Sequence, residues 1–228
     1  VRATVSNLVG GDSTTFSLAT TDVELVETGV AKAGSVTDAF HVQDYASGGD
    51  IYYSVGISTA DLKTGNPWVV VSNGVATLTV AQTGNVGVGD VLCQGVSCPG
   101  TGTKWYVRSV LSPTHFVVQN ANGTVPANFS GGNLGTITRT YNTIAAAESG
   151  SPTLIGGTSP SDLVTNNRRL TWVLYNDGPF NVSGATTIDG YITTATNYLT
   201  LTVAGASQVA SGVSQRHRGR AGTGAALE

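Results

Sequence analysis

The segment NPWVVVSNGVATLTVA, residues 66–81, constrains the fold of this chain more than any other stretch. Two runs of apolar and β-branched residues flank Asn73 and Gly74, and an Asn-Gly pair tolerates the positive φ angles that a two-residue hairpin turn requires. The runs VGVGDVL, KWYVRSVL and HFVVQNANG continue the pattern toward residue 138, with turn residues between them. We therefore expect short antiparallel strands here that close into a small barrel or a sandwich.

The composition indicates an exported, all-β protein. Only 11% of the residues are charged, against about 25% in average soluble domains, so Ser, Thr, Asn and Gln must cover much of the surface. The net charge of −3 and the lack of a basic face interleaved with aromatic residues argue against a nucleic-acid partner. No apolar run approaches the roughly 20 residues that span a bilayer. Because the chain also lacks Met, we expect a processed product that is secreted or displayed on the cell surface.

Cys93 and Cys98 are the only cysteines, and they lie in the segment CQGVSCPG. Their close spacing, with glycines around them, suits a tight loop closed by a disulfide. The alternative is a metal-binding or redox pair, but no His lies nearby in sequence to complete a set of metal ligands. We predict a disulfide that fixes a loop, which weakly indicates an oxidising compartment.

One short helix and several later strands are expected in the second half of the chain. The segment TRTYNTIAAAESG, residues 138–150, carries apolar residues at helical spacing and ends in Gly150, a common helix terminator. The runs RRLTWVLYNDG, ATTIDGYITT and NYLTLTVAG follow at intervals of roughly one to two dozen residues. Strands at such spacing can be successive rungs of a parallel β-solenoid.

Three segments together resemble the N-terminal part of secreted right-handed parallel β-helix proteins. These are IYYSVG at residues 51–56, YNTIAAAESG at 141–150 and the strands from Leu170 onward. The resemblance implies a first strand, a helix that caps the solenoid and the first rungs, with a small β module inserted between strand and cap. Residues 66–138 also loosely resemble small barrel modules of phage and secreted surface proteins. The alternative is a β-sandwich in which the helix is an incidental connector.

This interpretation divides the chain into three parts. Residues 1–65 hold N-terminal strands and the first β-helix strand, residues 66–138 the inserted barrel or sandwich, and residues 139–228 the cap helix, the rungs and a polar tail. Two or three rungs are fewer than such proteins usually carry, and repeat architectures need about three or more units plus a cap. Something must then cover the unfinished end.

We expect a second copy to cover it by adding an extended strand from residues 1–20. Such a contact joins different surfaces of two copies, so its repetition produces a ring or a filament. The sequence thus predicts a homo-oligomeric or polymeric structural subunit of an extracellular fibre or surface layer. The apolar residues of the donor segment are Val5, Leu8, Val9, Phe16 and Leu18.

Catalytic chemistry is sparse in this sequence, and we predict no enzyme, no cofactor and no metal site. The best carboxylate pair for glycoside cleavage is Asp177 with Asp189, and most other Asp residues stand in turn contexts. The alternative function is the N-terminal part of a tailspike-like protein that binds or cleaves polysaccharide.

Aromatic residues could contact a carbohydrate in that alternative. We expect the three tryptophans to be mainly core residues, and one of two adjacent tyrosines to be exposed because neighbours in a strand face opposite ways. The candidate glycan contacts are Tyr52, Tyr53 and Trp105, and the other two tryptophans are Trp68 and Trp172.

Overall fold

The computed structural model describes residues 13–16, 39–42, 49–96, 98, 100–180, 187–219 and 223–225. The chain divides into two compact units, residues 1–44 and 45–228. In the first unit, β1 (Ser13–Phe16) pairs with β2 (Ala39–Val42) in antiparallel orientation. All other elements belong to the second unit, which is described by itself below.

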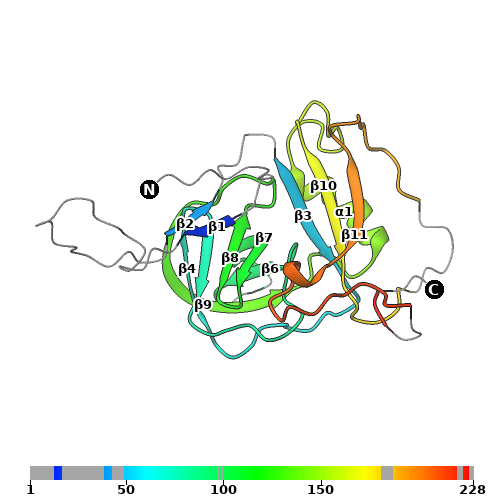
Figure 1. Cartoon of the computed structure of the whole chain (residues 1–228). Coiled ribbons are helices and arrows are strands. Elements are labelled where there is room, and N and C mark those ends of the chain that lie inside the picture. Colours follow the sequence, from blue (N-terminus) through cyan, green and yellow to red (C-terminus); the bar gives the residue numbers. More distant parts are fainter. Residues whose placement is uncertain are drawn as a thin grey trace, which may run out of the picture. The chain divides into compact units, whose positions relative to one another are not determined.

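Six antiparallel strands of the second unit form a closed barrel, in the order β4-β5-β8-β7-β6-β9 (Figure 1). Its hairpin between β4 and β5 turns at Asn73 and Gly74, with φ angles of 49° and 76°. This confirms the small antiparallel barrel and the turn that the sequence predicts. The strands are β4 (Trp68–Ser72), β5 (Val75–Leu78), β6 (Val91–Gln94), β7 (Thr103–Ser112), β8 (His115–Gln119) and β9 (Phe129–Thr138).

The barrel interior follows from the alternation along each strand. Val69 and Val71 of β4 point into an apolar core that also contains Trp105 and Phe116. Trp68 has the opposite parity to Val69 and is 45% exposed, so the expectation that it is a core residue is wrong. Burial of alternate side chains on six strands lets the barrel form its own core.

A three-stranded parallel sheet lies beside the barrel, in the order β11-β10-β3. Figure 1 shows β3 on the barrel side of this sheet and β11 on the far side. The structure confirms an all-β fold, but not the predicted parallel β-helix, because the described parallel strands form only this one sheet. The strands are β3 (Asp50–Val55), β10 (Arg169–Leu174) and β11 (Leu199–Val203).

The predicted rung ATTIDGYITT forms no strand in its described part, residues 187–194. Only an isolated bridge between Asp162 and Ile192 occurs there. Ile188 and Ile192 are exposed, so these apolar residues do not belong to a buried strand face. A short 3₁₀ helix, η2 (Ala206–Gln208), follows β11.

The helix α1 (Ile144–Ile155) runs past the predicted end at Gly150. Gly150 is required there for another reason, since a Cβ would lie 2.6 Å from a ring carbon of Tyr141. Pro152 lies inside the helix and cannot donate to the carbonyl of Glu148. The hydroxyl of Tyr191 donates to this carbonyl at 3.1 Å, which compensates for the missing helical bond.

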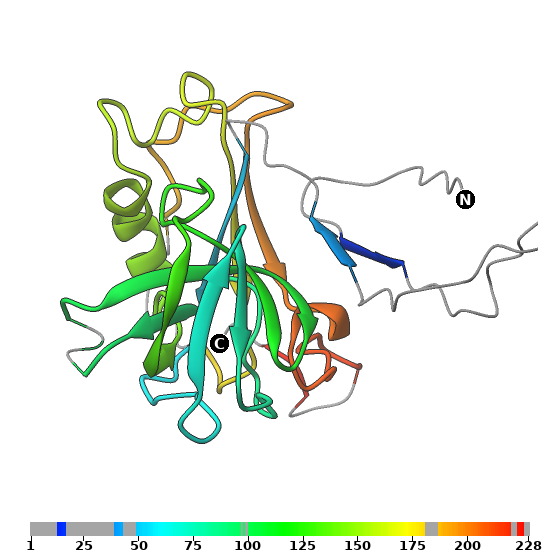
Figure 2. The ribbon, with the colours of Figure 1, turned by 90° about the vertical axis from the view of Figure 1, so that its left-hand side faces the viewer.

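One apolar cluster joins α1 to the sheet. Ile144, Ala147 and Ile155 pack on the face of β3 and β10 that carries Tyr53 and Trp172. Figure 2 shows the helix alongside this face. The helix thus covers the apolar face of the three-stranded sheet.

Candidate assembly site

The outer edge of β3 is sealed along its C-terminal half by backbone groups of the same unit. The Ser54 N–H donates to Gly89 O at 3.0 Å, and Ser54 O accepts from the Tyr141 N–H at 3.0 Å. The Gly56 N–H then donates to Tyr141 O at 3.0 Å. These bonds join β3 to the barrel side and to the segment that leads into α1.

Side chains from the barrel seal the N-terminal half of the same edge. Arg108 Nη1 donates to Asp50 O at 2.9 Å. In the orientation that satisfies both of its amide groups, Gln119 donates to Asp50 O at 3.2 Å and accepts from the Tyr52 N–H at 3.0 Å. Because Asp50 O, the Tyr52 N–H and both backbone groups of Ser54 already have partners, a further strand cannot form a regular ladder on this side.

The outer edge of β11 is different. A parallel strand bonds its neighbour through alternate residues, and β11 faces β10 through Tyr198 O and the Ala204 N–H at its two ends. The N–H and C=O groups of Leu199, Leu201 and Val203 therefore point away from β10. Among the described residues, only Arg216 bonds to this edge, with Nε donating to Val203 O at 3.3 Å.

Side-chain burial also decreases across the sheet from β3 to β11. Tyr53, Trp172 and Leu201 stand next to one another on β3, β10 and β11. The first two side chains are fully buried, whereas Leu201 is 38% exposed. Tyr198, just before β11, is 41% exposed. Among the described residues, the row of Tyr53, Trp172 and Leu201 is therefore only partly covered at Leu201.

At the C-terminal end of β11, two later segments of the chain continue the row of backbone hydrogen bonds. The Gln215 N–H donates to Ala204 O at 2.9 Å, and the Ala225 N–H donates to Gln215 O at 3.0 Å. Gln215 is 4% exposed, and its side chain accepts from the Asn176 N–H and donates to Val213 O. This corner is therefore occupied, and the open part of the edge lies toward Leu199.

A buried ion network fixes the sheet against the barrel. Arg139, just after β9, donates from Nη1 to both carboxylate oxygens of Asp90 at 2.8 Å and from Nε to Asp177 at 2.7 Å. Its guanidinium also lies 3.6 Å from the ring centroid of Tyr175. Burial alone would lower the pKa of Arg139, but the two carboxylates raise it, so the guanidinium stays charged.

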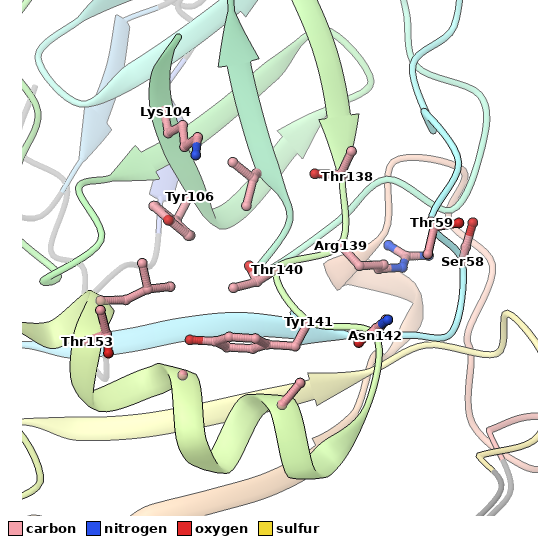
Figure 3. A pocket seen from close by; sticks show the side chains of 14 residues that line it. Ser58, Thr59, Lys104, Tyr106, Thr138, Arg139, Thr140, Tyr141, Asn142 and Thr153 are labelled. Atoms are coloured by element: carbon pink, nitrogen blue, oxygen red, sulfur yellow. The ribbon is translucent and has the colours of Figure 1, made fainter. Parts of the chain in front are cut away.

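A cleft of about 580 Å³ lies between the barrel and α1 (Figure 3). Its lining combines the aromatic residues Tyr106 and Tyr141 with hydroxyl groups from several segments, and Lys104 contributes a positive charge. Burial raises the pKa of the Tyr141 hydroxyl, and the nearby Ser151 hydroxyl lowers it in part. The cleft is suited to a small polar ligand with an apolar face.

The candidate glycan contacts do not form a surface site. Tyr53 is fully buried and its hydroxyl donates to Ala121 O at 2.6 Å. Trp105 is 2% exposed and packs on Phe129 in the barrel core. Tyr52 is half-buried, with the guanidinium of Arg108 over its ring. Tyr53 and Trp105 are therefore unavailable for stacking on a sugar, which corrects that prediction.

The other predicted residues have different outcomes. Cys93 and Cys98 form the predicted disulfide. Asp177 is bound by Arg139, while Asp189 is exposed, and no interaction joins the two carboxylates. Phe16 ends β1. The remaining donor residues lie outside the described residues: Val5, Leu8, Val9 and Leu18.

Sequence reasoning missed the Arg139 network and the location of the open edge. The sequence places Asp90 in a turn context, and the Gly87 N–H does donate to Asp90 at 2.8 Å. A charged residue that directly follows an apolar strand, as Arg139 does, was the available signal for a buried partner.

No protein-family model, curated protein or solved structure matches this chain. Within the described residues, no helix is long and apolar enough to cross a membrane, and no group of three His, Cys, Asp or Glu side chains could hold a metal ion.

Proposed function

We propose that this chain is a non-enzymatic structural subunit of an extracellular fibre or surface layer, whose copies join by β-strand addition at the outer edge of β11. The contrast between the two edges of the parallel sheet carries the proposal. Bonds within the unit occupy the outer edge of β3, whereas no described residue bonds to the outward backbone groups of Leu199 and Leu201. An open edge of this kind is a template for another chain.

The apolar side chains at this edge support the same function. Leu201 and Tyr198 are partly exposed beside the unpaired backbone, so an added strand would gain both hydrogen bonds and apolar burial. A contact between β11 of one copy and a different surface of the next is heterologous. Its repetition produces a filament or a ring rather than a closed dimer.

The decisive experiment replaces Leu201 by Pro and, as a matched control, by Thr. Both variants lose the leucine side chain, but only Leu201→Pro also removes the outward N–H, and an edge position tolerates proline. We expect Leu201→Pro to stay monomeric at concentrations where Leu201→Thr still assembles. Light scattering and negative-stain microscopy would measure assembly, and circular dichroism would confirm the fold. If both variants assemble like the parent chain, β11 is not the joining edge.

A second candidate function is the beginning of a parallel β-helix that binds or cleaves polysaccharide. Two observations favour it: the stack of Ala204, Gln215 and Ala225 continues past β11 within the same chain, and the cleft beside α1 combines aromatic and hydroxyl groups. The resemblance of the first strand, helix and later strands to secreted β-helix proteins also favours this second candidate. The chain would then be a cap and first layers rather than a fibre subunit.

A glycan array distinguishes the two candidates. Under the second, the purified chain binds particular glycans, and Lys104→Ala or Asn142→Ala in the cleft lining weakens that binding. The control is Thr103→Ala, a neighbouring exposed residue outside the lining. Absence of any binding by the parent chain would contradict a glycan function for the cleft.

A further inference from the structure

We propose that the outer face of the barrel binds a neutral saccharide chain, with one sugar ring stacked on Trp68 and the next ring in a pocket beside the disulfide between Cys93 and Cys98. This inference goes beyond the proposed function. It concerns a surface of the barrel and not the edge of β11, so it holds whether or not copies join at that edge.

Trp68 is the exposed aromatic residue of the barrel strands. It points outward from β4 and is 45% exposed, whereas the other aromatic side chains of these strands are buried or half-buried. On the neighbouring strand β9, a Cβ at Gly131 would lie 2.2 Å from Trp68 Nε1 and 3.0 Å from Cε2. Gly131 thus gives the nitrogen edge of the indole room against β9. The exposed remainder of the ring can pack on the apolar face of a sugar ring.

The surface around Trp68 carries no charge of its own. The strands β5, β4 and β9 are neighbours in the barrel, and their sequences contain no Asp, Glu, Lys or Arg. Asn133 stands directly opposite Trp68, and Thr79 is exposed just after β5. An aromatic ring among amide and hydroxyl groups offers no electrostatic attraction to a charged ligand, so it favours a neutral one.

A pocket of about 500 Å³ begins next to this ring. Asn133 lines it from the position opposite Trp68, and Asn66 lines it from the segment that leads into β4. Both residues are exposed, and no described residue hydrogen-bonds to either side-chain amide. Because each amide offers an acceptor and two donors, the pair can bind the hydroxyl groups of a second sugar ring.

The one charged residue in the lining of this pocket is Lys63, and its charge is already offset. Its Nζ donates to Gly135 O at 2.8 Å and lies 3.5 Å from a carboxylate oxygen of Asp61. The pocket therefore agrees with the surface around Trp68 in favouring a neutral ligand.

The disulfide fixes one wall of the pocket. Val96 and Cys98 belong to this wall, and Val96 is fully exposed at the rim. The disulfide packs closely between two glycines, since a Cβ at Gly102 would lie 2.6 Å from Cys98 Sγ and one at Gly135 would lie 3.0 Å from it. A short loop that is held in this way keeps the pocket open without ligand, which lowers the cost of binding.

The apolar area favours a saccharide over a protein partner. Among the described residues of the barrel strands and of the pocket lining, the exposed large apolar side chains are Trp68 and Val96. A stable protein interface buries about 800 Å² on each partner around an apolar centre. A small ligand needs one apolar contact and a few well-placed polar groups, and this surface provides both.

Binding of the dilute chain to an array of neutral and uronic-acid oligosaccharides tests the site, and titration with the best neutral oligosaccharide gives its Kd. We expect Trp68→Ala to raise the Kd at least about tenfold, because it removes a large apolar contact. Trp68→Phe keeps a flat ring and should raise it less, and Asn133→Ala should raise it as well. The control is Val125→Ala, an apolar side chain that is 40% exposed outside this surface, with an unchanged Kd. Circular dichroism would confirm the fold of each variant.

Several results would overturn the inference. One is a parent chain that binds no neutral oligosaccharide or prefers uronic acids, and another is an equal loss in Trp68→Ala and Trp68→Phe. Weaker binding in Lys104→Ala with an unchanged Kd in Trp68→Ala would place the saccharide in the cleft beside α1. If Trp68→Ala abolishes assembly, this face joins copies of the chain instead. Should Trp68→Ala fail to fold, an unchanged Kd in Asn133→Ala would still contradict the site.

Discussion

The barrel and the parallel sheet differ in whether their outermost strands have hydrogen-bonded neighbours. The barrel closes on itself, so each of its six strands has two neighbours. The sheet has three strands, with one edge sealed on the barrel side and the other, at Leu199 and Leu201, without a backbone partner among the residues that the structure describes. Under the proposed function, the barrel side prevents strand addition at β3 and leaves β11 as the edge at which another strand joins.

The largest expected effect comes from the ion network that holds the two regions together. Arg139→Leu leaves Asp90 buried without its partner, and breaking a buried ion pair in this way costs about 3–5 kcal/mol. Urea unfolding should show this loss in the free energy of unfolding. Asp177→Asn serves as a milder control, because the bonds between Arg139 and Asp90 remain. A loss below about 1 kcal/mol for Arg139→Leu would show that the network does not hold the regions together.

A matched pair of leucines compares the interior of the sheet with its open edge. Leu170 on β10 is fully buried and Leu201 on β11 is 38% exposed. Leu170→Ala should destabilise the dilute chain by about 2–5 kcal/mol, and Leu201→Ala by no more than about 0.5 kcal/mol. Thermal and urea unfolding would measure both. Equal losses at the two positions would mean that Leu201 is covered in the monomer.

Alkaline titration tests the seam between barrel and sheet. Tyr106 of the barrel packs edge-on against Tyr53 of the sheet, with ring centroids 5.6 Å apart. Burial raises the pKa of Tyr106 to about 12. The neutral phenol is thus favoured in the folded chain, and its stabilisation is present below about pH 10 and lost as the pH rises toward 12. The difference in absorbance at 295 nm between the parent chain and Tyr106→Phe should show that Tyr106 ionises late, together with loss of structure. Ionisation of Tyr106 near pH 10 in the folded chain would contradict burial at this seam.

A modest effect on stability, and none on assembly, is expected from loss of the disulfide between Cys93 and Cys98. It closes a short loop, so its loss should cost only about 2 kcal/mol in the chain-entropy estimate. The variant in which both residues are Ala should unfold at a lower urea concentration yet assemble like the parent chain, because the loop belongs to the barrel. Loss of assembly in a folded double variant would show that the loop takes part in the joining surface.

The sequence predicts features whose cause is local. Asn73 and Gly74 carry the hairpin within four residues, and the barrel follows from strands that are close in sequence. The end of α1 was wrong because Gly150 signals a terminator, whereas Tyr141 needs a glycine there for close packing. The exposure of Trp68 could have been predicted from its parity relative to the apolar Val69.

Features that depend on distant segments could not be predicted in the same way. The partners of Arg139 lie 49 and 38 residues away in sequence. No spacing rule joins residues at such separations. Whether a strand lies at an edge depends on every other pairing in the sheet. The sealed edge of β3 and the open edge of β11 therefore could not be predicted from the sequence.

Residue-resolved hydrogen exchange of the Leu201 and Ser54 amides tests the central claim most directly. Both belong to edge strands, but Ser54 donates to Gly89 O while the Leu201 N–H points outward. In dilute solution we expect Leu201 to exchange rapidly and Ser54 to be protected, and at assembling concentrations Leu201 should become protected as well. Protection of Leu201 in the dilute monomer, or its continued rapid exchange after assembly, would contradict the open edge as the joining site.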